Sequence, residues 1–181
     1  MKALYFGVML SMVSAPILAA QNSSDPTART NAIVASFSKF KSVDKEKRGV
    51  RKTKYVRVES KPAIRANPAD YSGKYEDVDF GFGLEFRVNA DGTFTGSGYE
   101  PVSENVKRSF TLRNGRIRGA LATATKVYAN GETESFEGAF MDRARYESPT
   151  DKGVTVFGFG LIGKLVEMHG MTINKFFFEK Q

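Results

Sequence analysis

Residues 80–88 read F-G-F-G-L-E-F-R-V, and this segment constrains the fold more than any other part of the chain. Apolar residues occupy every second position, and glycine or a charged residue occupies each position between them. A β-strand sends alternate side chains to opposite faces, so this segment as a strand has one fully apolar face, whereas a helical period of 3.6 scatters the same residues. The pentapeptide F-G-F-G-L recurs at residues 157–161. The pattern predicts an antiparallel β protein with a phenylalanine-rich interior.

Turn signals divide the chain after residue 71 into short segments of β-favouring residues. An Asn or Asp followed by Gly is typical of a two-residue hairpin turn. Such dipeptides occur at Asp91-Gly92, Asn114-Gly115 and Asn130-Gly131. Glycines inside the predicted strands, such as Gly138, favour strong coiling of the sheet. We therefore predict a mainly β fold: an antiparallel up-and-down meander of about 8–10 strands that closes into a small β-barrel. An open, strongly bent sheet is the alternative.

The predicted interior is rich in phenylalanine and follows the alternation of the strands. It comprises Phe80, Phe82, Leu84, Phe86, Val88, Phe94, Phe110, Leu112, Ile117, Leu121, Phe136, Phe140, Phe157, Phe159 and Phe177. These rings either fill the barrel or leave a pocket for a small apolar or amphipathic molecule, and both alternatives stay open. If a pocket exists, the candidate ligand-binding residues are Phe82, Phe86, Phe94, Phe136, Phe140 and Phe157.

One tripeptide resembles a known family. Gly73-Lys74-Tyr75, at the head of the predicted meander, resembles the G-x-W opening of lipocalin-like barrels, with Tyr75 where that motif has tryptophan. The resemblance ends with this tripeptide, and the disulfides of that family are absent. It implies a lipocalin-like architecture and assigns no family.

Residues 1–20 are predicted to be a secretory signal peptide. Lys2 gives a positive start, residues 3–20 carry no charge, and Ala19-Ala20 precedes a polar stretch, so cleavage is expected after Ala20. An uncleaved membrane anchor is the alternative; after cleavage we expect no transmembrane segment. The chain has no cysteine, which excludes disulfides, Cys-based zinc sites and thiol nucleophiles. We expect an exported protein, periplasmic or secreted, that is held together by its core alone.

Positive charge is concentrated in the N-terminal quarter of the mature chain. Residues 21–65 hold 12 Lys or Arg against 4 Asp or Glu, and residues 66–181 hold 14 against 16. This shift predicts two parts: a basic N-terminal helix and arm at residues 21–66, and the barrel domain at residues 67–181. An amphipathic helix is expected over about residues 26–41, because Asp25-Pro26 is a typical helix start. Its predicted apolar stripe is Ile33, Val34, Phe37 and Phe40.

The basic arm is a candidate contact for an anionic lipid or polysaccharide surface. Its candidate residues are Lys45, Lys47, Arg48, Arg51, Lys52 and Lys54. Tyr55 is the aromatic residue that adjoins them, and a nucleic-acid site would need more rings for base stacking. A solvated linker without a specific partner is the alternative.

No pattern in the sequence indicates a particular chemistry. His169 is the only histidine and lies beside glycine, as in a turn, and no acidic cluster has the spacing of a metal site. We expect neither a metal nor a cofactor. A carboxylate-dependent hydrolase would rest on Glu134 and Glu137, but the alternation places Glu137 on the solvent face, and Glu134 lies beside a turn. A binding protein is therefore favoured over an enzyme, and a non-catalytic structural or interaction module of the envelope is the second alternative.

Overall fold

The computed structural model describes residues 23–47, 50–77, 81–103, 106–146, 152–168 and 171–181. The predicted signal peptide, Arg48, Phe80 and His169 therefore lie outside the described residues. In chain order, the elements are α2 (Pro26–Phe37), β1 (Lys39–Lys47), β2 (Val50–Pro62), the 3₁₀ helix η1 (Pro68–Tyr71), β3 (Gly73–Glu76), β4 (Gly83–Val88), β5 (Thr93–Ser103), β6 (Val106–Arg118), β7 (Leu121–Tyr128), β8 (Thr133–Tyr146), β9 (Val154–Met168) and β10 (Met171–Lys180).

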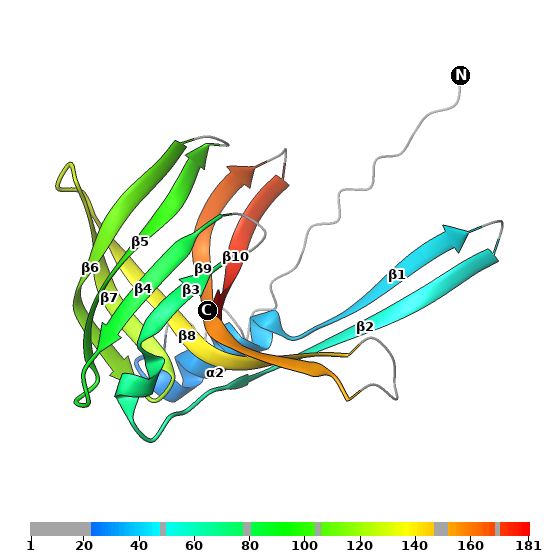
Figure 1. The fold of residues 1–181 in the computed structure, drawn as a ribbon, viewed down its shortest axis with the longest axis horizontal. Helices are drawn as coiled ribbons and strands as arrows, with labels where there is room; N and C mark the ends of the chain where they lie inside the picture. The colour runs from blue at the N-terminus through cyan, green and yellow to red at the C-terminus, as the bar shows by residue number, and fades with distance from the viewer. Residues whose placement is uncertain (1–22, 48–49, 78–80, 104–105, 147–151, 169–170) are drawn as a thin grey trace.

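Strands β3 to β10 form a closed antiparallel barrel of eight strands (Figure 1). Each strand pairs with the next one along the chain, and β10 returns to pair with β3. This closure is short: Glu179 pairs with Glu76, Lys180 pairs with Tyr75, and the amide of Gln181 donates to the carbonyl of Lys74 at 2.9 Å. The predicted up-and-down barrel is confirmed, and the alternative of an open sheet is wrong.

Two of the three predicted hairpin turns are present. Asp91-Gly92 joins β4 to β5, and Asn130-Gly131 joins β7 to β8. The prediction for Asn114-Gly115 is wrong, because this dipeptide lies inside β6 as a bulge, where the register against β7 shifts and Asn114 has a positive φ of 55°. A bulge residue with a positive φ, such as Asn114, needs the same left-handed backbone as a type I′ turn, so one dipeptide signals both. The turn itself lies between the cross-strand partners Arg118 and Leu121.

The barrel interior is filled by aromatic rings. Phe86 lies at its centre, 1% exposed, with the rings of Tyr75, Phe94, Phe136, Phe140 and Phe159 between 5.2 and 6.2 Å away. Glycine makes room for them, since a Cβ at Gly138 would lie 2.2 Å from the Phe159 ring.

The alternation predicts most of this core, with two errors. Phe177 and Leu121 face the outside of the barrel, where they take part in a second apolar cluster. Phe176 and Phe178 point inward instead, so the prediction chose the wrong phase in the run of three phenylalanines.

Helix α2 packs on the outer face of the barrel. It begins where the Asp25 carboxylate accepts hydrogen bonds from the amides of Thr27 and Ala28. Ile33, Val34 and Phe37 then contact a cluster formed by outward-facing residues of β7, β8, β9 and β10. These three members of the predicted stripe therefore lie on one face of the helix and are buried.

The helix ends four residues before the predicted end. Ser38 is already extended, and the amide of Ser60 donates to its hydroxyl oxygen at 3.0 Å. The residues after Ser38 then run beside β2 as a strand. Phe40 consequently lies in β1 and not on the helix. Among the described residues, no helix is long and apolar enough to cross a membrane.

The 3₁₀ helix η1 places Tyr71 in the interior core of the barrel. The Tyr71 ring is fully buried and stacks on Phe140 at 4.3 Å. Its hydroxyl accepts from the amide of Arg65 at 2.8 Å and lies 2.8 Å from the carbonyl oxygen of Ala63. Burial is the main cause that raises the pKa of Tyr71 above its usual value. Every polar atom of this ring is therefore satisfied inside the core.

Strands β1 and β2 form a two-stranded ribbon that projects from the barrel (Figure 1). Residues 57–62 of β2 pair with residues 141–146 of β8, on the edge that β7 leaves after Ala139. Residues 39–47 of β1 pair with residues 50–58 of β2. Residues 48–49, between the two strands, lie outside the described part of the chain, and the alternative of a solvated linker without a specific partner stays open.

Candidate functional site

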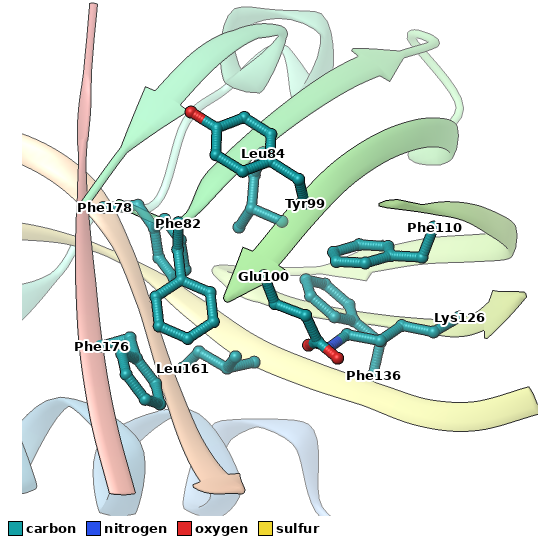
Figure 2. Close-up of a pocket in the computed structure, with 10 residues that line it drawn as sticks. All are labelled: Phe82, Leu84, Tyr99, Glu100, Phe110, Lys126, Phe136, Leu161, Phe176 and Phe178. Carbon is teal, nitrogen blue, oxygen red and sulfur yellow. The ribbon is translucent and has the colours of Figure 1, made fainter. Parts of the chain in front are cut away.

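Among the described residues, a cavity at one end of the barrel interior is very small. The cavity drawn in Figure 2 is about 10 Å³, which is room for about one water molecule. Apolar side chains such as Phe82, Phe176 and Phe178 line one side of it, and Glu100 and Lys126 line the other. The cavity is therefore a small gap between the rings and a polar end of the barrel, called here the mouth.

Five of the six phenylalanines predicted to bind a ligand belong to the interior core, and the sixth, Phe157, is partly buried and packs against it. Of these six, Phe82 and Phe136 line the small cavity. The other four mainly contact rings: Phe86 and Phe94 lie 5.5 Å apart, and Phe140 and Phe157 lie 6.1 Å apart. The structure brings the six together as core residues.

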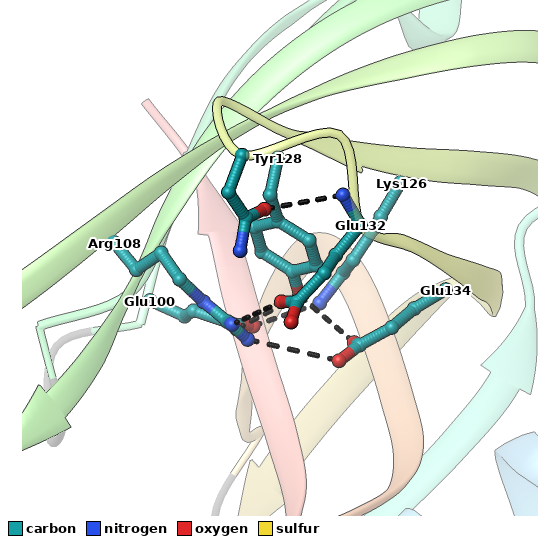
Figure 3. A network of polar contacts seen from close by, with 7 residues as sticks. Glu100, Arg108, Lys126, Tyr128, Glu132 and Glu134 are labelled. Atoms are coloured by element: carbon teal, nitrogen blue, oxygen red, sulfur yellow. Dashed lines mark hydrogen bonds and ion pairs between the residues drawn. The ribbon is translucent and has the colours of Figure 1, made fainter.

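At the mouth, inward positions of β5 to β8 and the turn between β7 and β8 carry a charged cluster, shown in Figure 3. We define the charged cluster as Glu100, Arg108, Lys126, Tyr128, Glu132 and Glu134. Glu100 is its centre and is 3% exposed. Its carboxylate accepts hydrogen bonds from Arg108 Nη2 at 2.8 Å, from Lys126 Nζ at 2.8 Å and from the Tyr128 hydroxyl at 2.9 Å.

Opposite charges and hydrogen bonds make this burial tolerable. An isolated buried carboxylate or ammonium is strongly unfavourable, whereas here Glu100 and Lys126 neutralise each other. Lys126 Nζ also lies 4.5 Å from the centre of the Phe110 ring, and the Arg108 guanidinium lies 3.8 Å from that of Tyr128. The hydrogen bond to Glu100 is the main cause that raises the pKa of Arg108, so this guanidinium stays charged.

Tyr128 links two carboxylates. Its hydroxyl oxygen lies 2.9 Å from Glu100 Oε1 and 2.8 Å from Glu134 Oε2, and its single proton can be donated to only one of them at a time. Burial, followed by these two contacts, raises the pKa of Tyr128 far above its usual value. The hydroxyl therefore stays protonated and holds the two acidic side chains in place.

The barrel wall has a gap beside the charged cluster. Pairing between β8 and β9 runs from Arg145 with Val154 to Gly138 with Leu161, although β9 continues to Met168 in partnership with β10. A cleft of about 490 Å³ lies where the two strands separate. It is lined by Lys126, Glu134, Ser135, Phe136, Glu137, Leu161 and Ile162. Lys126 and Phe136 connect this cleft with the interior, since both also line the small cavity.

Sequence reasoning did not identify Glu100, Arg108, Lys126 or Tyr128. A signal was present, because Glu100 has the parity of Phe94, Gly96 and Gly98 along β5. Which strands bring these side chains together depends on cross-strand register, and the sequence does not supply it. The two predicted carboxylates both line the cleft between β8 and β9, but they have different partners: Glu134 accepts from the Tyr128 hydroxyl, and Glu137 pairs with Arg29 of α2.

Five of the six basic residues predicted for the arm lie on the β1–β2 ribbon, and Arg48 lies outside the described residues. Lys45 and Lys47 are in β1, and Arg51, Lys52 and Lys54 are in β2. Lys45 is the cross-strand partner of Lys52.

A second cleft, of about 600 Å³, lies at the root of the ribbon. Its lining includes Ser38, Arg57, Asp142 and Tyr146. The guanidinium of Arg57 forms an ion pair with Glu59 and lies 5.5 Å from the centre of the Tyr146 ring. The root is therefore packed against the barrel by charged and aromatic side chains.

Comparison of the chain with protein-family models, with curated proteins and with solved structures found no match. Within the described part of the chain, no group of three or more His, Cys, Asp or Glu side chains could hold a metal ion.

Proposed function

We propose that this protein is an exported binding protein whose filled barrel presents a basic ribbon to an anionic surface. The observation that carries the proposal is the way the ribbon is built. At its root, β2 pairs with β8 of the barrel wall, while the outer residues of the ribbon form a two-stranded ladder. A two-stranded hairpin alone is at best marginally stable in water, so contact with a surface would stabilise this one.

The charge of the chain supports this proposal. Residues 39–58 contain many lysines and arginines and only two acidic residues, Asp44 and Glu46, whereas the barrel part of the chain is close to neutral. Positive charge in one projecting element attracts anionic surfaces with a strong dependence on salt. The predicted signal peptide supports a location outside the cytoplasm, where lipid headgroups and acidic polysaccharides are such surfaces.

A shortened ribbon tests the proposal. Lys41 and Val56 are cross-strand partners, so an Asn-Gly turn can join them in place of residues 42–55. The variant should keep the circular dichroism spectrum of a β-barrel and lose its salt-sensitive binding to anionic vesicles and to heparin. Equal binding by the variant and the unchanged chain would refute the proposal.

A second candidate function is the binding of a small amphipathic molecule in the cleft between β8 and β9. The observation that favours it is the cleft of about 490 Å³, which joins apolar Phe136 and Leu161 to the ammonium of Lys126. Buried Arg108 Nε, which makes no hydrogen bond to the described residues, offers a further donor nearby. The anionic head of a ligand would approach these cations, and its apolar part would lie along the gap.

This second function has its own test. Native mass spectrometry should detect a bound lipid-sized molecule, and a fluorescent fatty acid should bind the chain and be displaced by unlabelled fatty acid. Lys126→Met should weaken that binding, whereas Lys107→Met, on the exposed side of β6, should not. A chain that is empty by both methods rules out the second candidate.

A further inference from the structure

The register of the ribbon separates its charges onto two faces. Cross-strand partners in an antiparallel ladder lie on the same face, and the face alternates along each strand. One face is formed by the pairs Lys39 with Val58, Lys41 with Val56, Val43 with Lys54, Lys45 with Lys52, and Lys47 with Val50. This Lys/Val face therefore holds six lysines, four valines and no acidic residue.

The other face has a different composition. It is formed by the pairs Phe40 with Arg57, Ser42 with Tyr55, Asp44 with Thr53, and Glu46 with Arg51. Two arginines are balanced there by two acidic residues, so this face has no net charge. Both acidic residues and both aromatic residues of the paired segment fall on it, which leaves the Lys/Val face uniformly cationic and aliphatic.

We propose that the Lys/Val face docks on an anionic lipid bilayer. This inference rests on the proposed function and names its surface. Lysines near an anionic membrane are attracted to the headgroups, and aliphatic side chains between them can enter the boundary of the acyl chains. A paired segment of nine residues is about 30 Å long, enough to contact several headgroups at once.

The distribution of aromatic and arginine residues favours a bilayer over a polysaccharide or a nucleic acid. Stacking on bases uses aromatic rings, and bidentate recognition of phosphate or carboxylate uses the planar fork of arginine. On this ribbon, Phe40, Tyr55, Arg51 and Arg57 all lie on the opposite face. The Lys/Val face offers point charges and aliphatic side chains, the combination that suits an interface between water and lipid.

Two double variants with the same change in net charge test the face. Lys45→Gln with Lys52→Gln removes two charges from the Lys/Val face, and Arg51→Gln with Arg57→Gln removes two from the other. Binding of the chain without residues 1–20 is measured by co-sedimentation with vesicles of phosphatidylglycerol and phosphatidylcholine. The lysine variant should bind about 25-fold more weakly, from the typical effect of a single basic residue near an anionic surface. The arginine variant should bind no more than about threefold more weakly, because its charges act on the vesicle only through long-range attraction.

A third variant tests contact with the lipid itself. Val43→Thr with Val56→Thr keeps the charge and the preference for β structure. It should weaken binding to the vesicles by about tenfold or more, because two methyl groups are replaced with hydroxyls, and leave binding to soluble heparin unchanged.

Three outcomes overturn the inference, and they differ in what they mean for the proposed function. Equal losses in the two charge variants refute the assignment of the face. An unchanged valine variant, together with heparin binding as tight as vesicle binding, identifies a soluble polyanion as the partner and leaves the anionic-surface function standing. No binding to vesicles or to heparin refutes both.

Discussion

Replacing Glu100 with glutamine should destabilise the barrel more than any other single removal of a surface or mouth charge. The Glu100 side chain is 4% exposed and that of its partner Lys126 is 6% exposed. Glu100→Gln leaves the ammonium of Lys126 buried without its ion-pair partner, 4.5 Å from the centre of the Phe110 ring. The neutral amide also presents an N–H₂ group that cannot accept from Arg108 or Lys126.

The magnitude follows from the burial of this pair. Removing one partner of a buried ion pair typically costs about 3–5 kcal/mol, because the other charge stays buried without compensation. Arg108 is 34% exposed and can turn towards Glu132, so its part of the loss is partly recovered. We expect a loss of about 3 kcal/mol in the free energy of unfolding, which at a urea slope of about 2 kcal/mol per molar shifts the midpoint by about 1.5 M.

Urea unfolding followed by circular dichroism measures this loss in a double-mutant cycle. Lys126→Met should cost less than Glu100→Gln, because Glu100 keeps Arg108 and Tyr128. The double variant should be more stable than the sum of the two losses predicts, by about 1–3 kcal/mol, since removing both charges leaves neither unpaired. Glu85→Gln is the matched control: its side chain is 38% exposed and its partner Arg87 is 80% exposed, so the loss should stay below about 1 kcal/mol.

Two results would refute this reasoning. The first is a loss for Glu100→Gln no larger than that for Glu85→Gln, which would mean that water reaches the charged cluster. The second is additivity within about 0.5 kcal/mol, which would mean that Glu100 and Lys126 do not stabilise each other.

Three further predictions concern the core. Burial raises the folded-state pKa of Tyr71, Tyr75 and Tyr128. Their contribution to the free energy of unfolding is therefore complete below the pKa of an unfolded tyrosine, about 10, and is lost as the pH rises above it. The loss is up to about 1.4 kcal/mol per pH unit for each ring. The chain has seven tyrosines and no tryptophan, so absorbance at the tyrosinate band should show these three ionising only on unfolding; ionisation of all seven below the unfolding pH contradicts this. Phe140→Ala should cost about 3–5 kcal/mol in urea unfolding, because the ring is fully buried; a loss under about 1 kcal/mol would mean that the core collapses around the gap. Gly138→Ala should destabilise the barrel although alanine is small, because its Cβ would overlap the Phe159 ring at 2.2 Å, and thermal unfolding at an unchanged temperature would show that the ring can move aside.

The sequence predicts the barrel well because its information is local. Alternation at residues 80–88 and 157–161, with Asp-Gly and Asn-Gly turns, specifies strands and their inward faces without knowledge of partners. Where local information is ambiguous, the prediction fails. In the run Phe176, Phe177, Phe178 either phase gives an apolar inner face, and only the packing of Phe177 near Phe37 of α2, at 6.2 Å between rings, decides between them.

The charged cluster could not be predicted from local information. Glu100, Arg108, Lys126 and Tyr128 come from three strands, and their contacts depend on the register of β5 with β6 and of β6 with β7. The bulge at Asn114-Gly115 changes the second register, and the sequence presents that bulge as a turn. The ribbon was also underestimated, because its β1 half has no alternating apolar residues and pairs with β2 by backbone hydrogen bonds.

The short junction between β3 and β10 has a consequence for how the protein reaches its final form. β3 is the first strand of the ring to be synthesised and β10 is the last, so a newly made chain remains an unsealed sheet until residues 179–181 arrive. Both rims of that sheet then carry vacant backbone groups that can recruit another copy. The pairing of β3 with β10 joins residues far apart in the chain, so closure of the barrel is a slow step. Association between incompletely folded copies should therefore limit the yield of this protein more than the stability of its folded core does.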